Sequence, residues 1–349
     1  MVNGHEICCK YIPRKNHSNG NRSGGNKTRK RKVDVAPLFA EHADTEQLAY
    51  NLGAFHPGDE IEITLKIHGT SQRTGYLPVL KKMKRSLLDR ILRRPGKPIY
   101  DWGYVSGTRR TVLENYEGGY YGSNEFRETH SKFFEGKLMK GETVYYEVAG
   151  FTTSGAPIMA SVSNSKMNDK EFIKQYGETT VFSYGCEPNP KSLMIADPTA
   201  DEIVGVKIPL APQSDVYVYR MTMTNEDGFV VEYTPDFMRY RCEQMGVKCV
   251  PVFWKGFIPE NPASANDPTI EPGEWVKEVA ERYYEGTDPI GKTHIREGVV
   301  VRIINRPKFA AYKHKNFAFK VLEGIIKECA EAPDMEEAQE DLDLSKAEN

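Results

Sequence analysis

The chain has 349 residues and a formal net charge of −2, with 39% hydrophobic and 28% charged residues. This composition is typical of a globular protein with one large domain or two ordinary ones. It contains no apolar run of membrane-spanning length and no signal-peptide core at the N-terminus, which argues against a membrane protein and predicts a cytoplasmic one. The six cysteines form no CxxC pair and are expected to be reduced thiols.

Charge is distributed unevenly along the chain. Residues 1–32 carry nine Lys or Arg and one acid, whereas residues 328–349 carry nine acids and one base. Such segments bury too little apolar surface to fold, so we expect a basic, disordered arm over 1–34 and an acidic, disordered tail over 328–349. The arm could contact RNA phosphates or act only as a solubilising tail, and its composition is compatible with both.

Residues 35–327 are predicted to form one domain in which strands dominate. Alternation of apolar and polar residues predicts a half-buried strand over Glu60–Lys66. Six further strand-like runs lie at 104–113, 143–151, 215–224, 229–233, 298–304 and 309–315. Helical runs lie at 235–245, 274–284 and 319–330, and a short helix capped by residue 44 or 45 is expected to end at 52. Because helices do not alternate regularly with these strands, we predict an α+β fold of mainly antiparallel sheets with flanking helices.

A basic segment follows the first strand. Within residues 81–94, Leu87, Leu88, Ile91 and Leu92 fall at helical spacing. Pro95-Gly96 then ends the segment, so a basic amphipathic helical insertion is predicted over 81–96. Its cations suit either a solvated surface or a docking patch for phosphates, and its position close to Lys66 in the chain favours docking.

One motif match is rejected. Residues 286–293 read GTDPIGKT and fit the phosphate-loop pattern GxxxxGK[ST]. A phosphate cradle needs a buried strand before the loop and the N-terminus of a helix after it. Here a helix-like segment comes first and a strand follows, so we predict an ordinary loop.

The segment Lys66-Ile-His-Gly-Thr-Ser71 ends the first strand. A lysine held at a strand end, beside a glycine that lets the backbone approach a ligand closely, suits covalent catalysis. The pattern KxxG is also common by chance, as a solvated lysine before a turn. The neighbouring motifs therefore decide between the two interpretations.

Five more segments accompany this one in chain order. They contain RRT at 109–111, Glu147 in an apolar strand, the aromatic run YVY at 217–219, EGVV at 297–300 and AYKHKN at 311–316. Together with KIHGT they resemble the motifs of the covalent nucleotidyltransferases, which are the ATP-dependent ligases and capping enzymes. The resemblance covers roughly residues 50–320 and is closest to the nick-sealing RNA ligase 2-like family. His68 stands where DNA ligases and capping enzymes have the aspartate of KxDG, which favours an RNA ligase.

The resemblance implies a nucleotidyltransferase (adenylation) domain with ATP as its cofactor. Lys66 would attack the α-phosphate of ATP, release pyrophosphate and hold AMP as a lysyl phosphoramidate. Glu147 would accept a ribose hydroxyl, and Tyr219 would stack on adenine. Glu297 would hold the divalent metal, Mg²⁺ or Mn²⁺.

The same resemblance implies roles for the remaining matched residues. Lys313 and Lys315 would bind the AMP phosphate, and they share one face of a strand because residues i and i+2 project together. Arg110 aligns with the arginine of the second motif, and Arg109 beside it is the less favoured candidate. His68 would act when AMP passes to the RNA 5′-phosphate and the 3′-hydroxyl displaces it.

The chemistry needs these residue types independently of the resemblance. An ordinary lysine with a pKa near ~10.4 is less than ~0.1% neutral at pH 7, and only the neutral amine attacks. Two neighbouring cations would favour the neutral amine of Lys66, and a shift of ~3 pKa units corresponds to about 4 kcal/mol. The same cations and a metal would offset charge on the phosphate oxygens.

The predicted function is an ATP-dependent RNA ligase that joins 3′-hydroxyl and 5′-phosphate ends. Nicked duplex RNA is one candidate substrate, and an end-healing kinase or phosphatase is a candidate partner. An ATP-dependent DNA ligase, a capping-type nucleotidyltransferase and a catalytically weak RNA-binding protein on the same fold are the alternatives. The sequence departs from the family in two places. About thirty residues follow Lys315 where the family usually has a helical domain, and Ser71 stands where the phage enzyme of this family has Asn. In the family this helical domain helps to engage duplex RNA, and the arm and the basic insertion are candidates to replace its RNA contacts.

Overall fold

The computed structural model describes residues 8–10, 33–42, 45–92, 96–118, 120–188, 212–265 and 267–324. Most of the basic arm and the whole acidic tail lie outside these residues. Within the arm, strand β1 (Cys9–Lys10) pairs antiparallel with β10 (Phe229–Glu232), so these two residues extend a sheet where disorder was expected. None of the described helices is long and apolar enough to cross a membrane.

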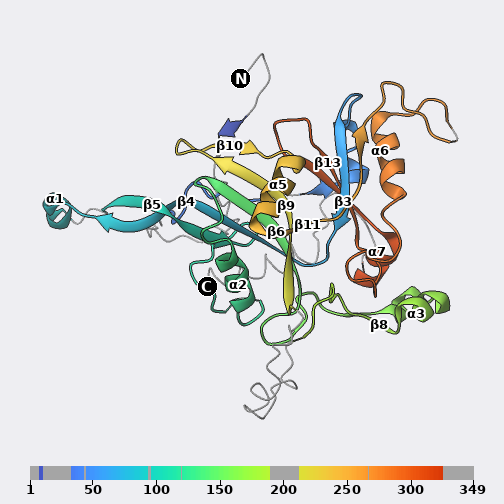
Figure 1. Cartoon of the computed structure of the whole chain (residues 1–349), viewed down its shortest axis with the longest axis horizontal. Coiled ribbons are helices and arrows are strands. Elements are labelled where there is room, and N and C mark those ends of the chain that lie inside the picture. Colours follow the sequence, from blue (N-terminus) through green and yellow to red (C-terminus); the bar gives the residue numbers. More distant parts are fainter. Residues whose placement is uncertain are drawn as a thin grey trace, which may run out of the picture.

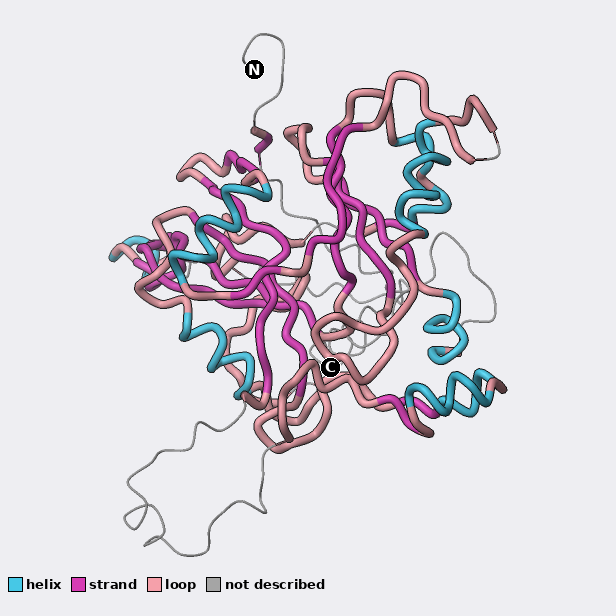
Figure 2. Tube along the Cα trace, turned by 45° about the vertical axis from the view of Figure 1, so that its right-hand side comes forward, coloured by secondary structure: helices cyan, strands magenta, loops and turns pink. Residues whose placement is uncertain are grey.

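Two sheets form the body of the protein, and they lie side by side (Figures 1 and 2). The larger has β1, β10, β9 (Ser214–Thr224), β6 (Glu142–Gly150), β4 (Thr70–Lys84) and β5 (Lys97–Gly107) in spatial order, with β11 (Lys248–Cys249) beside β9. The smaller has β12 (Val252–Phe257), β3 (Glu60–Lys66), β13 (Gly298–Ile303), β14 (Ala310–Lys315) and β2 (Glu46–Gln47) in spatial order. Only the pairs β11–β9 and β14–β2 are parallel among the described strand pairs, and the predicted α+β fold of mainly antiparallel sheets is confirmed.

Short helices flank the sheets. They are α1 (Leu87–Ile91), α2 (Glu125–Phe133), α3 (Lys170–Tyr176), α5 (Pro235–Met245), α6 (Pro272–Glu281) and α7 (Phe317–Glu323). A two-stranded ribbon of β7 (Val162–Ser163) and β8 (Thr179–Thr180) lies close to α3 in the sequence. The Thr234 hydroxyl accepts a hydrogen bond from a backbone N–H at the start of α5, and Pro235 occupies the first turn, which explains why this helix begins where it does.

The chain passes from the smaller sheet to the larger one between β3 and β4. Ile61 and Ile63 of β3 are fully buried in an apolar cluster with Val276 of α6. The alternate residues of β3 therefore point to the opposite face of the sheet. Gly69 makes the crossing possible, because a Cβ atom there would lie 2.4 Å from the carbonyl oxygen of Val148. The turn that follows Lys66 therefore lies where the two sheets meet.

The structure corrects two helix predictions. Strand β4 continues to Lys84 and pairs with β5, so residues 81–84 belong to a hairpin, and only Leu87–Ile91 at its tip is helical (Figure 1). The spacing of apolar residues in this segment does not reflect packing, because the Leu87 side chain is 76% exposed. The expected helix before residue 52 is instead β2 followed by the 3₁₀ turns Leu48–Tyr50 and Leu52–Ala54.

The rejected phosphate-loop match is a loop, as predicted. It connects α6 to β13 and is closed by a bridge between Thr287 and Ile295. The Asp288 carboxylate accepts hydrogen bonds from the backbone N–H groups of Ile290 and Gly291. These N–H groups bind a side chain of the loop itself and form no phosphate cradle.

Packing of α2 on the larger sheet gives the fold a pH-dependent contribution. His130 Nε2 lies 2.8 Å from Ser214 Oγ, and burial lowers the pKa of His130 to about 4. Between pH 6.5 and 4 the unfolded chain therefore binds a proton that the folded chain does not, so folding stability falls as the pH falls. We expect a loss of up to about 3 kcal/mol. Urea unfolding of wild type and His130→Gln at pH 7 and pH 4.5 tests this, and an equal pH dependence in both would contradict it.

Candidate active site

A cavity lies between the two sheets, and four of the predicted site residues line it together with Arg109, whereas His68, Arg110, Glu297 and Lys315 are not among its lining residues. Lys66, Arg109, Glu147, Tyr219 and Lys313 all line it. Lys66 and Lys313 come from the smaller sheet, and Glu147 and Tyr219 come from the larger one. The cavity thus depends on both sheets and on the turn that joins them.

The register of the smaller sheet places the three lysines on one face. Gly298 of β13 lies directly between Lys66 of β3 and Lys315 of β14, and the next row on this face holds Lys313. Gly298 has a φ of +150°, and a Cβ atom there would lie 2.2 Å from the carbonyl oxygen of His314. Only glycine fits this position, and it leaves the space between Lys66 and Lys315 open.

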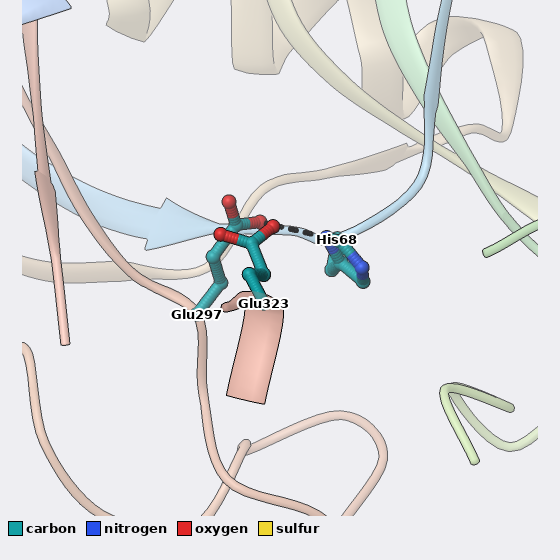
Figure 3. A group of neighbouring side chains, drawn as sticks. All are labelled: His68, Glu297 and Glu323. Atoms are coloured by element: carbon teal, nitrogen blue, oxygen red, sulfur yellow. Dashed lines mark ion pairs between the residues drawn. The ribbon is translucent and has the colours of Figure 1, made fainter. Parts of the chain in front are cut away.

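Glu297 fills that space and joins the two lysines. Its Oε1 atom lies 2.9 Å from Lys66 Nζ and 3.0 Å from Lys315 Nζ, while its Oε2 atom lies 3.3 Å from His68 Nδ1 (Figure 3 shows the His68 contact). The side chains of Glu297 and Lys315 are 1% and 2% exposed, and that of Lys66 is 14% exposed. Lys66 is thus the member of this cluster that reaches both the buried carboxylate and the cavity.

The charges around Glu297 determine its protonation. Burial by itself raises the pKa of the Glu297 carboxyl, but the adjacent Lys66 and Lys315 ammonium groups outweigh burial and hold that pKa well below its ordinary value. The carboxylate is therefore a poor proton acceptor, and it suits orienting the two lysines better than removing a proton. The sequence predicted only cations beside Lys66, whereas the structure also places this shared carboxylate against it.

His68 lies in the turn between the sheets. Its backbone N–H donates a 2.7 Å hydrogen bond to the Tyr184 hydroxyl. Its ring contacts Phe182 and Phe319 edge to face, with centroid distances of 4.5 and 4.8 Å. These contacts fix the ring with Nδ1 toward Glu297 and place it behind Lys66, outside the residues that line the cavity.

The larger sheet supplies the acid and the aromatic ring. Ser71 of β4 pairs in register with Glu147 of β6, and its hydroxyl lies 2.7 Å from that of Tyr219. Tyr219 is the extra residue of a β-bulge, because its two neighbours in β9 pair with consecutive residues of β6. A bulge changes the direction in which a side chain points, and the side chain at this bulge, Tyr219, lines the cavity.

The two neighbouring arginines are placed differently. Arg109 is 7% exposed and lines the cavity, whereas Arg110 is half-buried and is not among the lining residues. Placement therefore favours Arg109, the candidate that the sequence ranked second.

His42 is a wall residue that sequence reasoning missed. Its ring lies 5.0 Å from that of Tyr219 and 5.6 Å from that of Phe309, and both neighbours also line the cavity. Burial, together with nearby arginines such as Arg220, holds the pKa of His42 well below its ordinary value, so this imidazole is neutral at pH 7. Nothing in the surrounding sequence signals this position.

Glu323 is a second residue that the sequence did not single out. It ends α7, and its Oε2 atom lies 2.7 Å from Lys315 Nζ. The ligand atoms of His68, Glu297 and Glu323 lie within 4.8 Å of one another, a spacing that could hold a metal ion. The predicted metal ligand Glu297 thus belongs to a larger donor set (Figure 3).

The sequence matches no known family model and no curated protein. Among solved structures, the chain is similar to RNA ligase from Naegleria gruberi. A structure with PPi gives 12% identity and a TM-score of 0.43, covering 85% of this chain and 63% of that one. A mutant with ATP and Mn gives 14% identity and a TM-score of 0.44, covering 84% and 59%. A mutant without ligand gives 13% identity and a TM-score of 0.44, covering 84% and 63%. The present chain thus spans less than two thirds of the length of those chains.

Proposed function

We propose that the protein is an ATP-dependent RNA ligase that becomes covalently adenylated on Lys66. The observation that carries the proposal is the cavity itself. It brings an amine at 14% exposure together with the cations Arg109 and Lys313, the carboxylate Glu147 and the aromatic ring of Tyr219. A nucleophile, phosphate-binding cations, a hydroxyl acceptor and a stacking surface are the groups that nucleotide transfer needs.

The reaction then has three steps, and each exchanges one bond at phosphorus. In the first, the Lys66 ammonium gives a proton to water and its Nζ attacks the α-phosphorus of ATP, so that an N–P bond forms, a second proton passes from Nζ to water and pyrophosphate leaves. In the second, an oxygen of the RNA 5′-phosphate attacks the same phosphorus, the N–P bond breaks and RNA-adenylate forms. In the third, the 3′-hydroxyl gives its proton to water while its oxygen attacks the 5′-phosphorus, and AMP leaves with the electrons of the broken P–O bond.

The residues of the chain have distinct tasks in this proposal. Glu297 holds Lys66 and Lys315 in one row, so the amine is positioned before the nucleotide arrives. Lys313 and Arg109 face the cavity, where they can offset charge on the phosphate oxygens. Tyr219 offers a stacking surface for the base, and Glu147 an acceptor for a ribose hydroxyl. A divalent metal bound at Glu297, when present, supplies further charge neutralisation.

Covalent labelling tests the first step. The full-length protein is incubated with α-labelled ATP and Mn²⁺ and then denatured. We expect label on the protein that survives alkali and is lost in acid, and no label from γ-labelled ATP. Chasing the labelled protein with 5′-phosphorylated RNA should move the label to RNA, and a 3′-hydroxyl strand should then give joined product. Label from GTP in place of ATP would indicate a capping-type enzyme, and transfer to DNA ends alone a DNA ligase.

The arginine pair gives a sharper test of the cavity. Because Arg109 lines the cavity and Arg110 does not, Arg109→Ala should lower the rate of protein adenylation by about 10²-fold. Arg110→Ala, one residue away, is the matched control and should change the rate by less than about threefold. Single-turnover labelling of both variants decides which arginine acts in the cavity. A larger loss of rate in Arg110→Ala than in Arg109→Ala would restore Arg110, the residue favoured from the sequence.

A further inference from the structure

The strongest unexplained feature lies directly behind Lys66, where two carboxylates are buried side by side. The Glu297 and Glu323 side chains are 1% and 3% exposed. One oxygen of each contacts a lysine: Glu297 Oε1 contacts Lys66 and Lys315, and Glu323 Oε2 contacts Lys315. The ammonium groups therefore occupy one side of each carboxylate.

The other oxygen of each carboxylate is left over. Within the described part of the chain, Glu297 Oε2 and Glu323 Oε1 are buried and make no hydrogen bond. A buried acceptor without a partner costs about 1–3 kcal/mol, and more when it is charged. His68 Nδ1 lies 3.3 Å from Glu297 Oε2, and its ring is fixed there by Phe182 and Phe319. One ligand atom from each of His68, Glu297 and Glu323 thus lies within 4.8 Å of the other two (Figure 3).

We propose that His68, Glu297 and Glu323 together bind a divalent cation, with Glu323 of α7 as its third protein ligand. The ligand atoms lie within 4.8 Å of one another, and two ligands on opposite sides of an ion at about 2.1 Å are ~4.2 Å apart, so a small contraction completes the site. One nitrogen and two oxygen donors suit Mn²⁺ better than Mg²⁺ or Ca²⁺, which prefer oxygen alone.

The affinity of this site for a metal ion depends on the charge of Lys66. The Lys66 and Lys315 ammonium groups repel a cation at this point, so binding to the resting protein is weak. Removing the charge of Lys66 relieves part of that repulsion, and Lys66→Met should therefore tighten metal binding. This inference deepens the proposed function, since adenylation of Lys66 would have the same effect. The test of the metal site uses no nucleotide, so a failure to bind metal and a failure to adenylate Lys66 are distinguishable results.

Binding of Mn²⁺ alone to the full-length protein tests the proposal, followed by the loss of the EPR signal of free Mn²⁺. We expect one site in the wild type, an affinity at least about tenfold lower in Glu323→Gln and an affinity several-fold higher in Lys66→Met. Glu171→Gln is the matched control, because Glu171 is 85% exposed on α3 and should leave binding unchanged. No Mn²⁺ binding by the wild type, or wild-type affinity in folded Glu323→Gln, would overturn the proposal.

A spectroscopic measurement keeps the proposal testable if Glu323→Gln does not fold. Pulsed EPR of bound Mn²⁺ should show coupling to one ¹⁴N nucleus, from the His68 imidazole, and His68→Asn should remove that coupling. Bound Mn²⁺ without nitrogen coupling in the wild type would place the ion elsewhere and refute the site.

Discussion

Lys66→Ala and Lys66→Arg are both expected to reduce covalent adenylation by about 10³-fold or more, to the background of the assay. Alanine removes the nucleophile. Arginine keeps the positive charge beside Glu297, but its guanidinium does not lose a proton at any physiological pH and so cannot attack phosphorus. Labelling with α-labelled ATP, quantified on denatured protein, measures both variants. Retained label in Lys66→Arg would show that another residue is the nucleophile.

An exposed lysine on the neighbouring strand provides the matched control for Lys66. The Lys81 side chain is 60% exposed and pairs with Asp101 across the β4–β5 hairpin, far from the cavity in the sheet register. Lys81→Ala should adenylate at the wild-type rate. Equal loss of label in Lys81→Ala and Lys66→Ala would mean that general unfolding, and not loss of the nucleophile, explains the result, which circular dichroism of each variant checks.

Glu297→Gln is expected to lower the free energy of unfolding by about 3–5 kcal/mol and adenylation by about 10²-fold. The substitution keeps the size of the side chain but removes the negative charge between Lys66 and Lys315. Those ammonium groups lie 2.9 and 3.0 Å from the same carboxylate oxygen, so both lose their shared counter-charge while remaining near one another. Urea unfolding and covalent labelling measure the two effects separately.

An exposed ion pair is the control for this second prediction. Lys81 and Asp101 are 60% and 57% exposed, and ion pairs in water contribute about 0–1 kcal/mol. Asp101→Asn should therefore change the free energy of unfolding by less than about 1 kcal/mol. If Glu297→Gln lowers the free energy of unfolding no more than Asp101→Asn does, then Lys66, Glu297 and Lys315 are not the tightly coupled unit that their burial indicates.

The predicted elements agree best with the structure where one face of a strand or helix is buried. Strand β3 and helix α5 have the predicted bounds, and the predicted bounds of β6, β9, β13 and β14 differ by one residue at one or both ends. In such elements the apolar residues follow the period of the backbone, so local pattern and burial carry the same information. The same period placed Lys313 and Lys315 on one face of β14.

Strand β4 shows where this reasoning fails. Its residues from Thr70 to Thr74 are polar and yet all buried, so the sequence has no alternation to detect. Gln72 donates a hydrogen bond to the carbonyl oxygen of Arg127, and Arg73 donates to that of Phe39. Burial of polar side chains is stable when such partners exist, and these partners come from segments distant in the sequence.

By itself, the sequence determined the nucleophile candidate, the order of the motifs and the strands β3, β6, β9 and β14, because each depends on residues close together in the chain. The strand predicted through Arg109 and Arg110 ends before them, at Gly107. Tertiary structure decided that Glu297 joins Lys66 to Lys315, that Arg109 and not Arg110 lines the cavity, and that Glu323 lies beside Glu297. These contacts depend on strand register, a β-bulge and the packing of α7. All three are set by interactions between distant segments, for which a local pattern carries no signal.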